Sequence, residues 1–245
     1  MDNEMKGDLK IDGTGSAPGG EYNSVKINGA GRITGDTSCR EFRINGSGNV
    51  DGNIQMQDGR INGSGTIDGN IKARQLKIIG SAQVRGTISG DSLIVSGSVT
   101  IGDNLDVQKV KIEGSAKINH DCNAENFNSD GSFEINGLLN ADEINIKLYH
   151  LKSRAREIGG GRIHITTGSD AGFNVLKTIF TLGMYNPVLE ADSIEGDEIV
   201  LENTTAKVVR GTNITVGKGC NIGLVEYKGL FRKTGDAKVG EEKKI

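Results

Sequence analysis

Histidine and cysteine, two residue types that often carry out acid–base or nucleophilic chemistry, are rare in this 245-residue chain. The only histidines are His120, His150 and His164. None has a carboxylate or cysteine partner at a spacing typical of a catalytic triad or a metal site. We therefore expect surface or corner histidines, and we predict no catalytic residue, no metal site, no cofactor and no enzymatic activity.

The three cysteines, Cys39, Cys122 and Cys220, are odd in number and lie far apart. They match neither a disulfide framework nor a zinc spacing. A reducing cytosol fits this pattern best. We expect all three to be packed as small apolar residues rather than to react.

Glycine-rich stretches such as GSGTIDGN at Gly63–Asn70 imitate phosphate-binding loops. This one lacks the Lys-Ser/Thr ending and the strand–loop–helix context that such a loop needs. The net charge of −3 gives no overall field that would attract nucleic acid. The start, MDNEMKGDLK, does not resemble a secretory signal, and no apolar run approaches the roughly 20 residues that span a bilayer.

The glycines belong to a repeat. The sequence INGSG occurs at Ile44–Gly48 and again at Ile61–Gly65, which is a 17-residue spacing. Cutting the chain at this spacing from Val25 gives eight segments that reach Gly160 without a gap, and their aligned columns share residue types. The third column reads Ile27, Ile44, Ile61, Ile78, Val95, Ile112, Ser129 and Ile146, and the fifth holds Gly29, Gly46, Gly63, Gly80, Gly97, Gly114 and Gly131.

Within each segment, apolar and polar positions alternate with period two, as in a strand with one buried face. Three such runs occur per segment, separated by Gly, Asn and Asp. We therefore predict an all-β fold, a three-sided parallel β-helix whose coils stack about 4.8 Å apart. We expect the fifth-column glycines to adopt positive φ at a tight corner. A helix is disfavoured because each interior glycine costs it about 1 kcal/mol.

The repeat also sets the expected domain boundaries. Leu9 and Ile11 begin a shorter, 16-residue first coil, whose shortening lies at SAPGG, Ser16–Gly20. We expect a tail at residues 1–8, the β-helix core at 9–160, an inserted segment at 161–188, further coils at 189–229 and a second tail at 230–245. The residues expected to fill the further coils are Ile194, Ile199, Leu201, Ala206, Val208, Ile214, Val216, Ile222 and Val225.

The inserted segment contains the apolar stretch AGFNVLKTIFTLGMY, which includes Phe173, Ile179 and Phe180. One interpretation is a side hairpin or short helix that folds onto the solenoid. The other is a protruding apolar loop that contacts a partner subunit or a membrane surface, since exposed apolar patches mark such contacts.

Two outward columns carry polar side chains. Asn28, Asn45 and Asn62 share a corner column, where stacked amides can bond along the solenoid axis. A second column stacks five positive charges, and we interpret it either as a solvated edge or as a stripe that attracts an acidic partner or anionic lipid. This stripe consists of Lys26, Arg43, Arg60, Lys77 and Lys111.

The INGSG repeats, VDGNI at Val50–Ile54, IDGNI at Ile67–Ile71 and the 17-residue period resemble the bactofilins, a family of polymer-forming bacterial cytoskeletal proteins. The resemblance covers residues 9–160 and extends in weaker form to 228. It implies a triangular β-helix that joins end to end into non-polar, nucleotide-independent filaments. Such filaments organise cell shape, the envelope or motility machinery, in the cytoplasm and often at the inner face of the membrane.

The partners implied are other copies of the chain, the inner membrane surface or a related bactofilin, and no nucleic acid. The chain lacks the Pro-rich tails usual in the family and carries the extra segment at 161–188. Independently, the open edge of a first coil at Leu9 and Ile11 invites strand addition. Two other functions remain open: a carbohydrate-binding or adhesin-like surface module, and a left-handed β-helix acyltransferase, which the 17-residue period disfavours.

Overall fold

A computed structural model describes residues 7–149, 151–168 and 187–245, and the chain divides into two compact units, 1–120 and 121–245. Every regular element of the described residues is a β-strand. Each strand pairs in parallel with the strand one coil away, as the register of β5 and β7 illustrates. The predicted all-β parallel solenoid is therefore confirmed.

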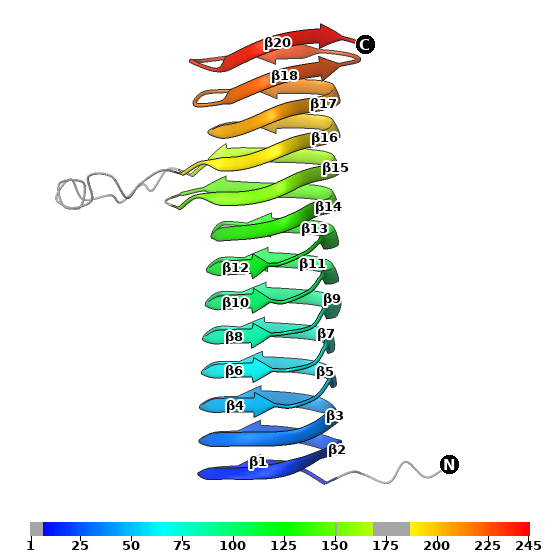
Figure 1. The fold of residues 1–245 in the computed structure, drawn as a ribbon, viewed down its shortest axis with the longest axis vertical. Coiled ribbons are helices and arrows are strands. Elements are labelled where there is room, and N and C mark those ends of the chain that lie inside the picture. The colour runs from blue at the N-terminus through cyan, green and yellow to red at the C-terminus, as the bar shows by residue number, and fades with distance from the viewer. Residues whose placement is uncertain (1–6, 150, 169–186) are drawn as a thin grey trace, which may run out of the picture. The chain divides into compact units, whose positions relative to one another are not determined.

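The described part of the N-terminal unit contains twelve strands, which Figure 1 shows coil upon coil in blue to green. They are β1 (Leu9–Ile11), β2 (Thr14–Ile27), β3 (Ala30–Ile44), β4 (Ser47–Val50), β5 (Ile54–Ile61), β6 (Ser64–Ile67), β7 (Ile71–Ile78), β8 (Ser81–Val84), β9 (Ile88–Val95), β10 (Ser98–Ile101), β11 (Leu105–Ile112) and β12 (Ser115–Ile118).

In this unit, residues that lie 17 positions apart in the sequence pair in neighbouring strands. Ile44 pairs with Ile61, and Ile61 pairs with Ile78. All three side chains are at most 2% exposed. The third column of the sequence is therefore a continuous buried ladder of isoleucines.

The corners of each coil are visible in the burial pattern. In β5 the buried residues are Ile54 and Met56, then Gly59 and Ile61, so the inward phase slips by one residue in the middle of the strand. The register of β5 with β7 skips Gln57 at the same place. With the four-residue strands such as β4, each coil thus has three short sides, as predicted.

The first coil is shorter, as expected. Thr14 pairs with Ala30 at a 16-residue offset, whereas Gly20 pairs with Thr37 at a 17-residue offset. The register shifts between Pro18 and Gly20, inside the SAPGG stretch that was predicted to absorb the shortening.

The prediction for the fifth-column glycines is wrong. Those from Gly29 to Gly114 do not have positive φ. They are glycines because the coils approach closely there: a Cβ on Gly63 would lie 2.0 Å from the carbonyl oxygen of Gly46, one coil below. The constraint is packing between coils and not backbone conformation within one.

The C-terminal unit contains the remaining strands. They are β13 (Cys122–Ser129), β14 (Ser132–Leu148), β15 (Ser153–Thr167), β16 (Leu189–Leu201), β17 (Thr204–Val216), β18 (Asn221–Tyr227), β19 (Phe231–Lys233) and β20 (Lys238–Lys244).

Coil length varies in this unit. β13 and β14 keep the 17-residue offset, as Phe127 and Ile144 show. The offset becomes 20 for Ile135 and Ala155, because extra residues lie between β14 and β15. The gap-free phase expected up to Gly160 is therefore wrong from the corner after β14 onward. Further along, β16 and β17 pair at a 15-residue offset, and β17 and β18 at a 16-residue offset.

Two boundaries also differ from the expected ones. β15 continues in register to Thr167, seven residues beyond 160. The stretch 230–245, expected to be a tail, contains β19 and β20, which pair with β17 and β18. Residues 161–167, which were expected to begin the insertion, therefore belong to a strand of the solenoid.

The interior of the C-terminal unit is nearly as predicted. Of the residues expected to fill it, all are buried except Val208, which points outward, and its neighbour Val209 is fully buried instead. Two adjacent valines cannot be assigned to a face by type alone, because the face depends on where the corner falls. Thr204, also fully buried, donates its hydroxyl to the carbonyl oxygen of Glu202 at 2.9 Å.

Candidate assembly surfaces

The first coil presents an open strand edge. β1 pairs with β2 and, among the described strands, with no other. Its inward residues continue the apolar ladders, because Leu9 aligns with Val25 and Ile11 with Ile27. Leu9 is only half-buried, since none of the described strands lies on its other side. This edge combines unpaired backbone groups with incompletely covered apolar side chains.

The predicted basic stripe is a stacked column in the structure. Lys26, Arg43, Arg60 and Lys77 occupy successive coils in register. Lys77 then pairs with Ile94 and Ile94 with Lys111, so one isoleucine interrupts the column. Sequence reasoning missed Lys10, which pairs with Lys26 and begins the column. The 16-residue length of the first coil was the signal for it.

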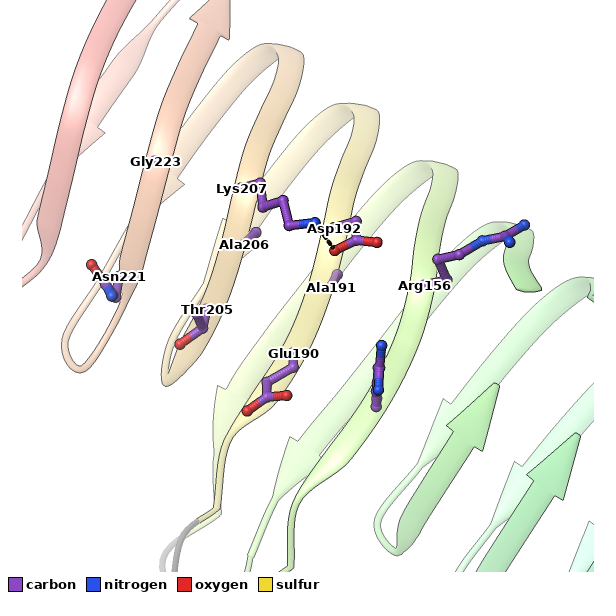
Figure 2. A pocket seen from close by; sticks show the side chains of 10 residues that line it. Arg156, Glu190, Ala191, Asp192, Thr205, Ala206, Lys207, Asn221 and Gly223 are labelled. Carbon is purple, nitrogen blue, oxygen red and sulfur yellow. Dashed lines mark ion pairs between the residues drawn. The ribbon is translucent and has the colours of Figure 1, made fainter. Parts of the chain in front are cut away.

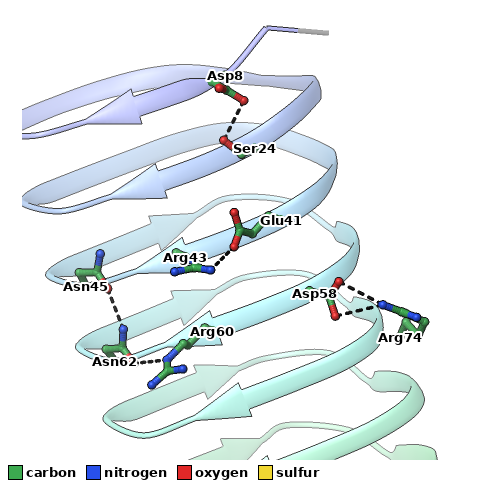
Figure 3. A network of polar contacts seen from close by, with 9 residues as sticks. All are labelled: Asp8, Ser24, Glu41, Arg43, Asn45, Asp58, Arg60, Asn62 and Arg74. Carbon is green, nitrogen blue, oxygen red and sulfur yellow. Dashed lines mark hydrogen bonds and ion pairs between the residues drawn. The ribbon is translucent and has the colours of Figure 1, made fainter. Parts of the chain in front are cut away.

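Acidic side chains beside the column compensate part of its charge, and an amide accepts a hydrogen bond from one of its arginines. Arg43 forms an ion pair with Glu41, and the Arg60 Nε donates to Asn62 Oδ1 at 2.8 Å (Figure 3). At the two ends of the column, Lys10 Nζ lies 2.9 Å from Asp12 and Lys111 Nζ lies 2.6 Å from Glu113. These lysines lower the pKa of both carboxyls. Along the column itself, like charges remain stacked.

The predicted amide ladder is also present. The side-chain nitrogen of Asn62 donates to Asn45, that of Asn45 to Asn28, and that of Asn28 to Asp12, each at 2.7 Å. The link between Asn45 and Asn62 is drawn in Figure 3. Because every amide donates to the coil below, the ladder ties the coils together at this corner.

A charged groove in the C-terminal unit has a different pattern. A groove of about 470 Å³ is lined by Arg154, Arg156, Glu190, Asp192 and Lys207 together with smaller residues. Charges alternate from coil to coil, and Lys207 Nζ lies 2.7 Å from Asp192 Oδ1 (Figure 2). Lys207 is the main cause of the lowered pKa of Asp192. The groove is thus largely self-neutralised.

The three cysteines are buried as free thiols, and His120 lies beside a carboxylate. Burial raises the pKa of the Cys39 thiol to about 12 and also raises that of Cys220, so both thiols stay protonated. Cys122 is fully buried in the column that Leu139 continues. His120 lies 3.5 Å from Asp103, with both side chains exposed. Within the described residues, no three His, Cys, Asp or Glu side chains gather as metal ligands do.

Several predicted positions cannot be placed. Phe173, Ile179 and Phe180, and also His150, lie outside the described residues. The described part of the chain contains no helix long and apolar enough to cross a membrane.

The fold and these surfaces define a parallel β-solenoid with a 17-residue repeat, whose prominent features are stacked side-chain columns and an open first coil. The chain belongs to the bactofilin family, described as polymer-forming and cytoskeletal, because the family model matches residues 2–82 and 49–140.

Two curated relatives come from Bacillus subtilis (strain 168). The uncharacterized protein YhbE is 39% identical over 103 residues, which are 42% of this chain and 41% of YhbE. The uncharacterized protein YhbF is 43% identical over 86 residues, which are 35% of this chain and 32% of YhbF. The match thus spans less than half of either relative. No solved structure matches the chain.

Proposed function

We propose that this chain is a non-enzymatic scaffold subunit that self-associates through the ends of its β-solenoid into nucleotide-independent polymers. In this role it organises envelope, shape or motility machinery in the cytoplasm. The observation that carries the proposal is the open first coil, where β1 pairs on one side only among the described strands and Leu9 is incompletely buried.

An edge of this kind favours strand addition for two physical reasons. Its free N–H and C=O groups gain hydrogen bonds from an added strand. The apolar ladder gains a covering rung, and burial of apolar surface stabilises by about 25 cal/mol per Å². Neither contribution requires a nucleotide, which agrees with the lack of a phosphate-loop motif in the sequence.

The basic column supports a further part of the proposal, a surface that faces an acidic partner or the anionic inner membrane. Four like charges occupy consecutive coils from Lys26 to Lys77. Stacked like charges repel one another, so an anionic surface would relieve the repulsion and gain about 1 kcal/mol for each basic residue near it. Phe173, Ile179 and Phe180 stay proposed as additional association residues.

The test replaces Leu9 by Asp, because a charge at this half-buried edge position would have to be desolvated in any coil-to-coil contact. Light scattering of the purified chain should show large assemblies that fall to the mass of one chain in Leu9→Asp. Ile79→Asp is the matched control, since Ile79 is an outward isoleucine, 37% exposed, that follows a strand paired on both edges.

A wild-type chain that is monomeric at all concentrations contradicts the proposal. So does a Leu9→Asp variant that keeps the wild-type circular dichroism and the wild-type size. Loss of assembly in both variants would indicate a general effect of added charge and not an edge contact.

A further inference from the structure

We propose that the basic column is a docking surface for an acidic amphipathic helix of another protein, and that Ile79 and Ile94 form the apolar contact that selects this helix. The inference rests on the proposed function, because it names the chemistry of the acidic partner that the basic column faces there. It concerns a side of the solenoid and leaves the first coil free for association.

Two outward columns change residue type in neighbouring coils. Along the basic column, Lys77 pairs with Ile94 and Ile94 with Lys111, so an isoleucine stands where the other coils of the unit carry a cation. Along the asparagine ladder, the backbone N–H of Ile79 donates to the carbonyl oxygen one coil below at 2.8 Å, as that of Asn62 does (Figure 3 shows Asn62). Ile79 therefore occupies the asparagine position of the next coil.

The two isoleucines are neighbours on the outer face. Ile79 follows Lys77 by two residues and points outward as Lys77 does. Because Lys77 pairs with Ile94, Ile79 lies diagonally from Ile94, and diagonal neighbours on one face of a sheet are about 7–8 Å apart. Ile79 is 37% exposed and Ile94 is half-buried. One apolar side chain of a partner can therefore contact both.

The solenoid itself does not explain this pair. An asparagine at position 79 could extend the ladder by another amide hydrogen bond, such as the 2.7 Å bond between Asn62 and Asn45, and isoleucine gives up that bond. An uncharged residue at position 94 relieves repulsion between Lys77 and Lys111, but a polar residue would do so equally well. Adjacent exposed apolar side chains with a charged rim are typical of an interaction site.

The shape of the patch favours a protein over a membrane as the partner. Lys77 and Lys111 stand on either side of Ile94, and a lysine side chain is longer than that of isoleucine. A flat anionic bilayer would contact the ammonium groups first and leave the isoleucines uncovered. A protein can place carboxylates on the lysines and insert an apolar side chain between them.

The spacing of the coils favours a helix within that protein. Coils stack about 4.8 Å apart, so the column repeats at that interval. One face of an α-helix repeats about every 5.4 Å, whereas one face of an extended strand repeats roughly every 6.8 Å. A helix along the solenoid axis, with an apolar residue i over Ile94, places residue i+4 beside Lys77 and residue i+7 beside Arg60.

The charges at these levels call for acidic residues at i+4 and i+7. Lys111 Nζ already lies 2.6 Å from Glu113. Lys77 and Arg60, in contrast, form no ion pair with any other residue that the structure describes. They are therefore the principal sites for carboxylates of the partner, with which they form charge-assisted hydrogen bonds.

The experiment measures the binding of a fluorescein-labelled peptide of about 18 residues, long enough to form a helix, by fluorescence anisotropy. The peptide carries Leu at i and Glu at i+4 and i+7, and a second peptide carries Ala at i. The wild-type chain should bind the Leu peptide about tenfold more tightly than the Ala peptide, because only leucine covers the two isoleucines.

The protein variant Ile79→Asn/Ile94→Lys restores the residue types of the neighbouring coils. It should bind the Leu peptide about tenfold more weakly than the wild type does, although it carries one more positive charge. Val200→Asn is the matched control, since Val200 is an outward branched residue of the C-terminal unit that is also 37% exposed. It should bind as the wild type does.

The contrary outcomes are distinct. Tighter binding by Ile79→Asn/Ile94→Lys would show that charge alone attracts the partner, and would overturn the apolar contact. Equal binding of the Leu and Ala peptides to the wild type would overturn it as well, whether or not the variant folds. Binding to vesicles of phosphatidylglycerol and phosphatidylcholine in equal parts, without binding to the Leu peptide, would assign the column to a membrane.

Light scattering of the same samples separates this inference from the proposed function. A wild-type chain that stays monomeric and binds the Leu peptide in preference to the Ala peptide would remove the self-association and keep the docking surface. Large assemblies that bind neither peptide would keep the self-association and remove the docking surface.

Discussion

The two units of the chain build similar interiors with different exteriors. In the N-terminal unit, the coils after the first keep the 17-residue length, and identical residues stack outside as well as inside, as in the asparagine ladder and the basic column. In the C-terminal unit the coil length is not constant, since Ile135 pairs with Ala155 but Ala191 with Ala206, and outward charges alternate.

This difference shows which part of a solenoid repeat is under physical constraint. Inward columns must remain apolar because each rung covers the next, whereas coil length can change at a corner without disturbing them. A constant length allows identical side chains to form ladders. Where the coil length varies, outward side chains are stabilised by individual ion pairs, such as those of Arg210 with Glu195 and Glu226.

The largest expected effect tests whether the interiors are equivalent. Ile78→Ala in the N-terminal unit and Ile199→Ala in the C-terminal unit remove side chains that are at most 1% exposed. Each should lower the free energy of unfolding by about 2–5 kcal/mol, through lost transfer energy and a residual cavity. Urea unfolding measures both. A clearly smaller loss in one unit would show that its interior is less tightly packed.

The next prediction tests the close approach of coils at the glycine corner. Gly63→Ala places a Cβ 2.0 Å from the Gly46 carbonyl oxygen, so the coils must separate, at a cost of more than about 2 kcal/mol. Gly159→Ala is the control in the C-terminal unit, since its Cβ would have no neighbour nearer than 3.7 Å. It should change stability by no more than about 0.5 kcal/mol. Equal melting points for the two variants would disprove the packing explanation.

A smaller effect distinguishes the side-chain hydrogen bonds that link neighbouring coils in the two units. Partial burial acts to raise the pKa of Glu202, but the backbone N–H and hydroxyl of Thr167 both donate to its Oε2 at 2.8 Å and the net pKa is lowered. The stability that these two hydrogen bonds contribute is therefore present above pH 4.5. It is lost as the pH falls through the lowered pKa of Glu202.

The measurement compares the thermal midpoints of the wild type and Glu202→Gln at pH 6 and pH 3. The wild type should be the more stable at pH 6, and the difference should shrink at pH 3. The amides of Asn45 and Asn62 in the other unit do not titrate, so an Asn45→Ala variant should show a difference that is the same at both values. A constant difference for Glu202→Gln would contradict the assignment.

The smallest expected effect comes from exchanging the two charge patterns, which are stacked like charges in the N-terminal unit and alternating charges in the C-terminal unit. Arg60→Glu places a carboxylate between Arg43 and Lys77 and should raise stability by about 0.2–1 kcal/mol. Arg210→Glu places one between Glu195 and Glu226 and should lower it by a similar amount. Both shifts should disappear in 1 M salt, where the screening length is about 3 Å. A salt-independent shift would indicate packing instead of charge.

Much of the fold was readable from the sequence because its signal is repeated. The recurrence of isoleucine at Ile44, Ile61 and Ile78 predicts their shared column. The SAPGG stretch predicts where the first coil is shortened. Single events are harder to read. The choice between Val208 and Val209 depends on one corner, and the role of the fifth-column glycines depends on atoms of the neighbouring coil.

The candidate site was predicted only in part for the same reason. Leu9, Ile11 and the basic column follow from the repeat, but Lys10 depends on the shorter first coil. The alignment of Glu242 and Lys244 with Val225 and Tyr227 was missed, because it is defined only by the pairing of β20 with β18. In sequence they are part of an ordinary charged stretch.

The sequence by itself determined the class of fold, the period, the apolar ladders and the family, since each depends on residue types that recur at a constant spacing. The tertiary structure decided where coils lengthen, which side chains of the last coil point inward and how charges pair outside. Those features depend on register, and register results from the stacking of whole coils rather than from any local preference of the chain.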